Sequence, residues 1–190
     1  IERVGVVGAG QMGAGIAEVC LKAGADVVIF EPTEALAEAG RNRIATSLDR
    51  AVAKGKLAAD DREVALARLT ATTTLADLAD RQLVIEAIVE DENVKAKVFA
   101  ELDEVITDPD AVLASNTSSI PIMKIASATK NPSRVLGLHF FNPVPVLPLV
   151  ELISTLVTSD AAVARVESFA ANTLGKKVVR CSDRSGFIVN

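Results

Sequence analysis

The sequence has few of the residues from which metal sites and disulfide frameworks are built. Its 190 residues include two cysteines, Cys20 and Cys181, and one histidine, His139. At these spacings the three side chains cannot form a metal site. The cysteines are far apart in sequence, so we expect two buried thiols in a reducing compartment rather than a disulfide. The sequence therefore predicts a cytoplasmic protein without a metal cofactor.

Positive charge and long apolar runs are also scarce. The chain has 20 Lys and Arg against 25 Asp and Glu, and its net charge of -5 gives no long-range attraction for nucleic acid or an anionic membrane. Its longest apolar stretches, such as residues 144–150, are far shorter than the roughly 18 residues that a membrane-spanning helix needs. Neither nucleic acid nor a membrane is therefore an expected partner.

The apolar pattern predicts one α/β domain covering residues 1–190. Short continuous apolar runs, which are typical of buried strands, alternate with stretches of helical periodicity. This alternation predicts a mostly parallel sheet, with antiparallel strands at one edge. The predicted strands are 3–7, 27–30, 83–87, 111–114, 135–138, 149–153 and 176–181, and the predicted helices include 13–23, 93–106 and 160–174.

Residues 31–81 contain more helical sequence than one crossover connection needs. Two stretches with helical spacing lie on either side of residues 54–56. We predict that they form a helical hairpin that projects from the sheet. The predicted apolar face of the first helix is Ile44, Leu48 and Val52, and that of the second is Val64, Leu66 and Leu69.

A glycine-rich loop joins the first predicted strand to the first predicted helix. Gly8, Gly10 and Gly13 spell GxGxxG, which allows a tight turn, close approach of a pyrophosphate and close packing of helix on strand. The helix that follows offers unpaired N–H groups to phosphates. Glu31 stands at the end of the second strand, 18 residues after Gly13 and close to the expected spacing of about 20. A carboxylate there can bind ribose hydroxyls and repel a 2'-phosphate. The loop predicts NAD rather than NADP, although a structural turn and a solvated Glu31 are alternatives.

A histidine and a glutamate occupy unusual positions in two neighbouring strands. His139 follows the strand 135–138, and ligands of open α/β sheets bind outside the carboxyl ends of the strands. Imidazole can serve as the base that alcohol oxidation by hydride transfer requires. Glu151 lies within the apolar strand 149–153, where a carboxylate is costly unless it is paired, and a turn between the strands can place it beside His139. On spacing alone, a core histidine is an equally good interpretation.

Four polar residues, NTSS at 116–119, directly follow the predicted strand 111–114. They should therefore lie at the same edge of the sheet as His139, where their hydroxyl groups could hydrogen-bond a substrate oxygen. The alternative, which the sequence supports equally, is that they cap a helix beginning near Ile120.

Several strings together resemble the 3-hydroxyacyl-CoA dehydrogenase family, most closely its short members of the 3-hydroxybutyryl-CoA type. They are VGVVGAGQMGAGIA at 4–17, VIEAIVED at 84–91, LASNTSSI at 113–120, GLHFFNPVPV at 137–146, LVELI at 149–153 and GFIVN at 186–190. The resemblance implies a Rossmann-like, doubly wound α/β fold, NAD as the cofactor and an acyl-CoA as the substrate. It also implies an all-helical C-terminal domain, absent from these residues, through which the full-length protein forms a homodimer. The apolar run at 186–190 agrees with a chain that continues.

The resemblance also assigns roles to individual residues. His139 matches the catalytic base and Glu151 its partner, while Ser118 and Asn190 match groups that contact the substrate near the reacting carbon. The implied cofactor-binding residues are Gly8, Gly10, Gln11, Met12, Gly13, Glu31, Glu90, Lys95 and Asn142. The implied contacts to the CoA portion are Ser47 and Lys54. Glu31 departs from the aspartate usual in the family, but its longer side chain can still reach ribose hydroxyls.

The implied function is NAD-dependent oxidation of an L-3-hydroxyacyl-CoA, with 3-hydroxybutyryl-CoA as the favoured substrate, or the reverse reduction. A first alternative is a dehydrogenase of a free 3-hydroxy acid, although such enzymes commonly use a lysine base. A second is a nucleotide-binding relative without turnover, of the kind found among lens crystallins. A third is a part of a multifunctional β-oxidation chain.

Overall fold

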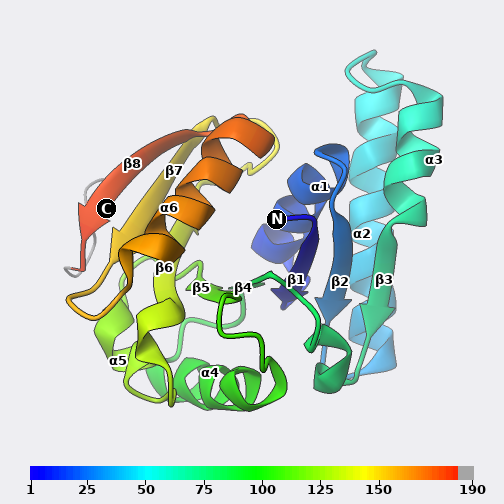
Figure 1. Ribbon diagram of the computed structural model, residues 1–190. Helices are drawn as coiled ribbons and strands as arrows, with labels where there is room; N and C mark the ends of the chain where they lie inside the picture. The colour runs from blue at the N-terminus through cyan, green and yellow to red at the C-terminus, as the bar shows by residue number, and fades with distance from the viewer. Residues whose placement is uncertain (184–190) are drawn as a thin grey trace.

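Within residues 1–183, which the computed structural model describes, eight strands form one sheet (Figure 1). The order across the sheet is β3-β2-β1-β4-β5-β6-β7-β8. The first six strands in this order are parallel, β7 is antiparallel to β6, and β8 is parallel to β7. The strands are β1 Arg3–Val7, β2 Asp26–Phe30, β3 Leu69–Thr72, β4 Leu83–Glu86, β5 Val112–Ser115, β6 Val135–Phe140, β7 Leu149–Ser154 and β8 Lys177–Ser182.

Helices pack on both faces of this sheet, which confirms the predicted doubly wound, Rossmann-like fold. Apolar side chains of α1, α2, α3 and α6 form the core on one face, and those of α4 and α5 form the core on the other. The helices are α1 Gln11–Lys22, α2 Glu34–Ala53, α3 Ala59–Ala67, α4 Glu92–Val105, α5 Ile122–Ala126 and α6 Asp160–Ser168. Shorter turns are η1 Leu75–Leu78, η2 Pro132–Arg134 and η3 Phe169–Thr173.

The central strands read as continuous apolar runs because both of their faces are buried. In β1, the side chain of Val6 belongs to the core beneath α1, while that of Val7 belongs to the core beneath α4. The parallel strands are joined through helices, as parallel neighbours require. The connection 141–148 between β6 and β7 contains no helix, so β7 returns antiparallel, as predicted.

The predicted helical hairpin consists of α2 and α3, which lie side by side and extend beyond the strands at the β3 edge of the sheet (Figure 1). The prediction for Leu69 is wrong, because α3 ends at Ala67 and Leu69 begins β3. Two β-branched threonines in Leu69–Thr72 favour a strand, and this segment pairs with the open edge of β2. Val64 is also misassigned, since its side chain is 56% exposed.

The two cysteines are buried thiols, as predicted. Burial raises the pKa of the Cys20 thiol to about 12, and the positive charge of Lys176 opposes this rise only in part. A thiol that stays protonated is a poor nucleophile. In the described part of the chain, no helix is long and apolar enough to cross a membrane, and no three His, Cys, Asp or Glu side chains are grouped to hold a metal ion.

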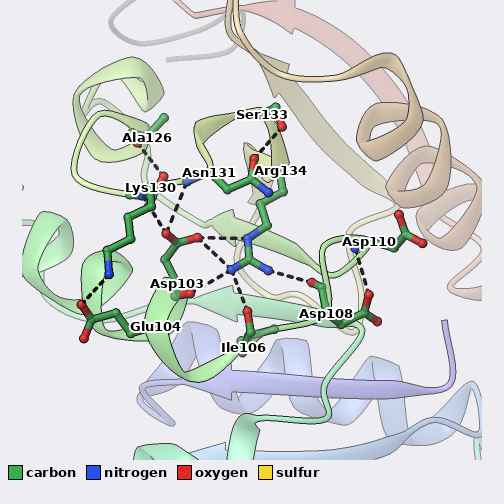
Figure 2. A network of polar contacts seen from close by, with 11 residues as sticks. Asp103, Glu104, Ile106, Asp108, Asp110, Ala126, Lys130, Asn131, Ser133 and Arg134 are labelled. Carbon is green, nitrogen blue, oxygen red and sulfur yellow. Dashed lines mark hydrogen bonds and ion pairs between the residues drawn. The ribbon is translucent and has the colours of Figure 1, made fainter.

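A buried ion pair joins the end of α4 to Arg134, the residue directly before β6 (Figure 2). The Arg134 guanidinium donates hydrogen bonds to the Asp103 carboxylate at 2.8 and 3.1 Å, and the two side chains are 6% and 3% exposed. The same guanidinium donates to the backbone oxygens of Asp103, Ile106 and Asp108. A cation here also interacts favourably with the C-terminal end of the α4 dipole. Because β6 carries His139, this contact fixes that strand relative to α4.

We expect Arg134→Met to lower the free energy of unfolding by about 3 to 5 kcal/mol, because Asp103 would be left as an unpaired buried charge. Arg180→Met is the matched control. Arg180 pairs with Glu167 at 2.5 Å, but the two side chains are 62% and 33% exposed, so water screens the pair and the effect should be small. Urea denaturation measures both, and equal losses would contradict the importance of the buried network.

Candidate functional site

A cleft of about 500 Å³ opens outside the carboxyl ends of β1, β2 and β4. The strand order reverses between β1 and β4, which is where ligands of doubly wound sheets bind. The cleft is lined mainly by apolar side chains, including those of Phe30, Leu36 and Val94, with the carboxylate of Glu31 among them. An apolar slot beside one carboxylate suits the adenosine half of a dinucleotide.

The glycine loop forms one wall of this cleft, and each glycine has its own structural reason. Gly8 has a φ of 89°, which side chains other than glycine rarely adopt. A Cβ atom on Gly13 would lie 1.7 Å from the backbone oxygen of Gly8, so α1 can pack on β1 only through a glycine. A Cβ atom on Gly10 would meet nothing within 4 Å. Gly10 therefore leaves open space at the start of α1, where no side chain caps the N–H groups, and this arrangement fits a pyrophosphate.

Glu31 lies beside the glycine loop, where the sequence predicts it. Its Oε1 accepts a hydrogen bond from the backbone N–H of Ala9 at 2.5 Å. The backbone oxygen of Ala9 in turn accepts a hydrogen bond from Arg43 Nη1 at 2.5 Å. The peptide of Ala9 is thus held from both sides, and the Glu31 carboxylate stays at the cleft where an adenosine ribose would lie. Its contact with ribose remains a prediction.

A second cleft, of about 330 Å³, lies at the ends of β4, β5 and β6 and shares Ala87 and Ile88 with the first. The structure brings six of the predicted site residues together around it. They are Met12, Glu90, Lys95, Ser118, His139 and Asn142. The two clefts form a continuous site across the carboxyl edge of the sheet.

His139 and Glu151 are directly opposite each other in the antiparallel register of β6 and β7. His139 Nδ1 lies 2.8 Å from Glu151 Oε2, and the two side chains are 8% and 0% exposed. The ring of Phe141 packs against the imidazole with a centroid distance of 4.5 Å. The structure thus brings the pair together as the sequence predicts, and the carboxylate has the partner that its burial demands. The role of the pair in catalysis remains a prediction.

The NTSS segment lies beside His139, and Glu90 fixes its conformation. Glu90 Oε1 accepts hydrogen bonds from the Thr117 hydroxyl and from the backbone N–H of Ser118 at 3.1 Å. The side-chain oxygen of Asn116 accepts a hydrogen bond from the backbone N–H of Phe140 at 2.8 Å, which ties the segment to the end of β6. These contacts place Ser118 at the cleft that His139 also lines.

The alternative interpretation of this segment as a helix cap is wrong. The next helix, α5, begins at Ile122, and no side chain of 116–119 caps it. Its first N–H groups, those of Ile122 and Met123, donate instead to the carboxylate of Asp183 at 2.7 and 2.8 Å. Asp183 follows β8 and is distant in sequence, so local spacing could not indicate this cap.

Glu90 is held as a carboxylate by its neighbours. Partial burial acts to raise its pKa, but the hydrogen bond from Thr117 and the positive charge of Lys95 outweigh burial and lower the pKa below its usual value. The Lys95 ammonium lies 3.3 Å from Glu90 Oε2. Both predicted cofactor-binding residues therefore line the second cleft and contact each other.

A fully buried network beneath the cleft was not predicted from the sequence. Lys95 Nζ lies 2.5 Å from Glu86 Oε1, and the side chains are 1% and 0% exposed. Glu86 Oε1 also accepts from the backbone N–H of Ile88, and Glu86 Oε2 accepts from the Ser115 hydroxyl. The signal was available, because Glu86 is a carboxylate in an apolar strand, as Glu151 is.

Asn142 and the turn that follows it, residues 143–148, close one side of the site; because it contains three prolines, we call it the proline-containing turn. The side chain of Gln11 donates a hydrogen bond to that of Asn142 at 3.3 Å, which joins the glycine loop to the segment after β6. Buried Lys176, which the sequence did not indicate, donates to the backbone oxygens of Val144 and Leu147 at 2.6 and 2.8 Å. The turn is thereby anchored to the start of β8.

The remaining predicted residues are not at these two clefts. Ser47 lines a third cleft, of about 250 Å³, between α1, α2 and the proline-containing turn, and its hydroxyl donates to Glu18 at 2.6 Å. Lys54 is exposed at the end of α2 and does not line that cleft. Asn190 lies outside the described residues.

Comparison with known families matches residues 3–184 to the family described as 3-hydroxyacyl-CoA dehydrogenase, NAD binding domain. A 3-hydroxybutyryl-CoA dehydrogenase from Mycobacterium tuberculosis is 72% identical over 190 residues, which are 100% of this chain and 66% of that protein. A 3-hydroxybutyryl-CoA dehydrogenase from Bradyrhizobium diazoefficiens is 46% identical over 190 residues, which are 64% of its length. This chain therefore spans only part of the length of these relatives, 66% of the first and 64% of the second.

Solved structures show the same likeness. The crystal structure of M. tuberculosis FadB2 matches with a TM-score of 0.99 and 72% sequence identity. The match covers 100% of this chain and 67% of the FadB2 chain. The crystal structure of 3-hydroxybutyryl-CoA dehydrogenase from Escherichia coli K12 matches with a TM-score of 0.95 and 43% sequence identity. The match covers 100% of this chain and 40% of the E. coli chain.

Two alanine substitutions separate the structural glycine from the one expected to face the cofactor. Gly10→Ala should leave the free energy of unfolding within about 1 kcal/mol of wild type, because its Cβ enters open space, yet weaken NADH binding on the order of 10-fold or more. Gly13→Ala should lower the free energy of unfolding by about 3 kcal/mol, because its Cβ would clash with the backbone oxygen of Gly8. Urea denaturation and NADH fluorescence titration measure these effects. If Gly10→Ala bound NADH as tightly as wild type, the pyrophosphate of NAD would not bind at this loop.

Proposed function

Because the chain belongs to the 3-hydroxyacyl-CoA dehydrogenase family, we propose that the full-length protein oxidises an L-3-hydroxyacyl-CoA to the 3-ketoacyl-CoA with NAD, or catalyses the reverse reduction. The proposed substrate is 3-hydroxybutyryl-CoA, after the names of the relatives. The observation that carries this proposal is the His139–Glu151 pair, 2.8 Å apart, in a cleft that continues from the glycine loop.

NAD, when bound, supplies the acceptor for the hydride that leaves C3 of the substrate. The open face of Gly10 and the uncapped start of α1 would hold its pyrophosphate, together with Gln11 and Met12. Glu31 would bind the adenosine ribose, and its negative charge would disfavour the 2'-phosphate of NADP. Glu90, Lys95 and Asn142 would face the nicotinamide side.

His139 is the proposed general base. Its Nδ1 is bonded to Glu151, so Nε2 is the nitrogen that would take the proton of the substrate 3-hydroxyl. The negative charge of Glu151 would orient the ring and stabilise the imidazolium that forms. Ser118, at the same cleft, would hydrogen-bond the substrate oxygen as it becomes a ketone. In the reverse direction, the imidazolium would return the proton to that oxygen.

We propose that the full-length protein is a homodimer formed through an all-helical C-terminal domain. The family resemblance of the sequence and the greater length of the M. tuberculosis relative support this proposal. Light scattering of the full-length protein, compared with residues 1–190 alone, would test it.

The direct test of the activity is the loss of NADH absorbance in the presence of acetoacetyl-CoA, with the full-length protein. His139→Gln should lower kcat on the order of 10² to 10⁴-fold and leave NADH binding unchanged, because the general base is lost without a change in the nucleotide cleft. Glu151→Gln should lower kcat less, since the amide can still orient the imidazole without stabilising its charge.

Two outcomes would overturn this proposal. A wild-type protein that binds NADH but turns over no 3-ketoacyl-CoA would be a binding protein rather than an enzyme. A wild-type protein that prefers free acetoacetate to its CoA thioester would be a dehydrogenase of a free 3-hydroxy acid.

A further inference from the structure

Glu86 lines neither of the two clefts of the site, yet its carboxylate holds residues that do. It ends β4 and is completely buried, where a carboxylate is costly unless donors surround it. Its Oε1 accepts hydrogen bonds from the Lys95 ammonium and the backbone N–H of Ile88, and its Oε2 accepts one from the Ser115 hydroxyl. Ile88 lines both clefts and Lys95 lines the second, so this one side chain fixes two parts of the wall of the site.

These contacts belong to a closed ring of five residues. From Glu86 the ring passes to Ser115, whose hydroxyl oxygen accepts a hydrogen bond from the backbone N–H of Thr117 at 3.2 Å. The Thr117 hydroxyl donates to Glu90, the other carboxylate oxygen of Glu90 lies 3.3 Å from Lys95 Nζ, and Lys95 returns to Glu86. The ring therefore joins β4 and α4 to the segments that follow β4 and β5.

Lys95 is the buried member of this ring that also lines the second cleft. A lysine ammonium has three N–H donors on a flexible stem of four carbons. The carboxylates of Glu86, at 2.5 Å, and Glu90, at 3.3 Å, account for two of these donors among the described residues. One donor is left for a ligand in the cleft, and the two carboxylates decide where the ammonium lies.

We propose that Glu86 is a positioning residue for the nicotinamide half of NAD, an inference that rests on the function proposed above. Lys95 carries the contact to the cofactor, and Glu86 sets the place at which that contact is made. Because the ammonium is already held, its side chain loses little conformational freedom when the cofactor binds. Of the two carboxylates, Glu86 is the fully buried one, so it can hold Lys95 without itself touching the cofactor.

Glu86→Gln in the full-length protein removes the charge and keeps the shape of the side chain. The amide oxygen can still accept from Lys95 and Ile88, which share one oxygen of Glu86, and the amide nitrogen can donate to Ser115. A hydrogen bond to a neutral acceptor is weaker, so we expect the Kd for NADH to rise about 3- to 10-fold. The Kd for ADP, which lacks the nicotinamide half, should not change. Fluorescence titration measures NADH, and calorimetric titration measures ADP.

A double-mutant cycle shows whether Glu86 acts through Lys95. Lys95→Met removes the expected contact to the cofactor but leaves Glu86 as an unpaired buried charge, which the double variant with Glu86→Gln avoids. Effects that pass through one shared contact are not additive. We therefore expect the double variant to bind NADH no more weakly than Lys95→Met does.

Asp103→Asn is the matched control for a loss of stability. Asp103 is a buried carboxylate of α4, the helix that carries Lys95, and it pairs with Arg134 away from both clefts. Urea denaturation should show that Glu86→Gln and Asp103→Asn both lower the free energy of unfolding. The Kd for NADH should rise only in Glu86→Gln.

An unchanged Kd for NADH in Glu86→Gln would overturn the inference. An equal rise in the Kd for ADP, or an equal rise for NADH in Asp103→Asn, would also overturn it, because the loss would then come from the fold. Additive effects in the cycle would show that Glu86 does not act through Lys95. NADH binding needs no turnover, so a wild type that binds NADH but reduces no 3-ketoacyl-CoA would end the proposed function and leave this inference standing.

Discussion

The site depends on the antiparallel register between β6 and β7. That register sets His139 opposite Glu151, so that the fully buried carboxylate of Glu151 has the imidazole of His139 as its hydrogen-bond partner. A shift by one residue would turn the side chain of Glu151 to the other face of the sheet, away from the imidazole. Contacts outside the two strands support the pairing, because Arg134 ties β6 to α4 and Lys176 ties the connecting turn to β8.

Features that depend on local sequence could be predicted. The buried parallel strands appear as short apolar runs, and GxGxxG requires glycine for steric reasons that hold within one strand, turn and helix. A buried charge and a turn between two strands allowed the pairing of His139 with Glu151, but they allowed a core histidine equally well, and the structure decides between the two. Their placement with Ser118 and Glu90 follows from the rule that parallel strands present their carboxyl ends at one edge.

Features that depend on distant contacts could not be predicted. β3 forms because β2 offers an unpaired edge, and four residues with two threonines give too weak a periodic signal to reveal it. Asp183 caps α5 although it lies 60 to 61 residues farther along the chain than the N–H groups that it binds. Lys176 looks like a surface lysine until the turn at Val144 folds over it. The cleft beside Arg43 exists only when α1, α2 and that turn are assembled.

The buried network of Glu86, Lys95 and Ser115 constrains how this protein can change over evolutionary time. Glu86 accepts hydrogen bonds from both Lys95 and Ser115, and removing one partner of a buried ion pair costs about 3 to 5 kcal/mol, a large part of the stability of a typical domain. A lineage can leave this arrangement only by exchanging several members almost together. The buried floor of the site is therefore inherited as a unit, while exposed side chains elsewhere on the surface are free to diverge one at a time.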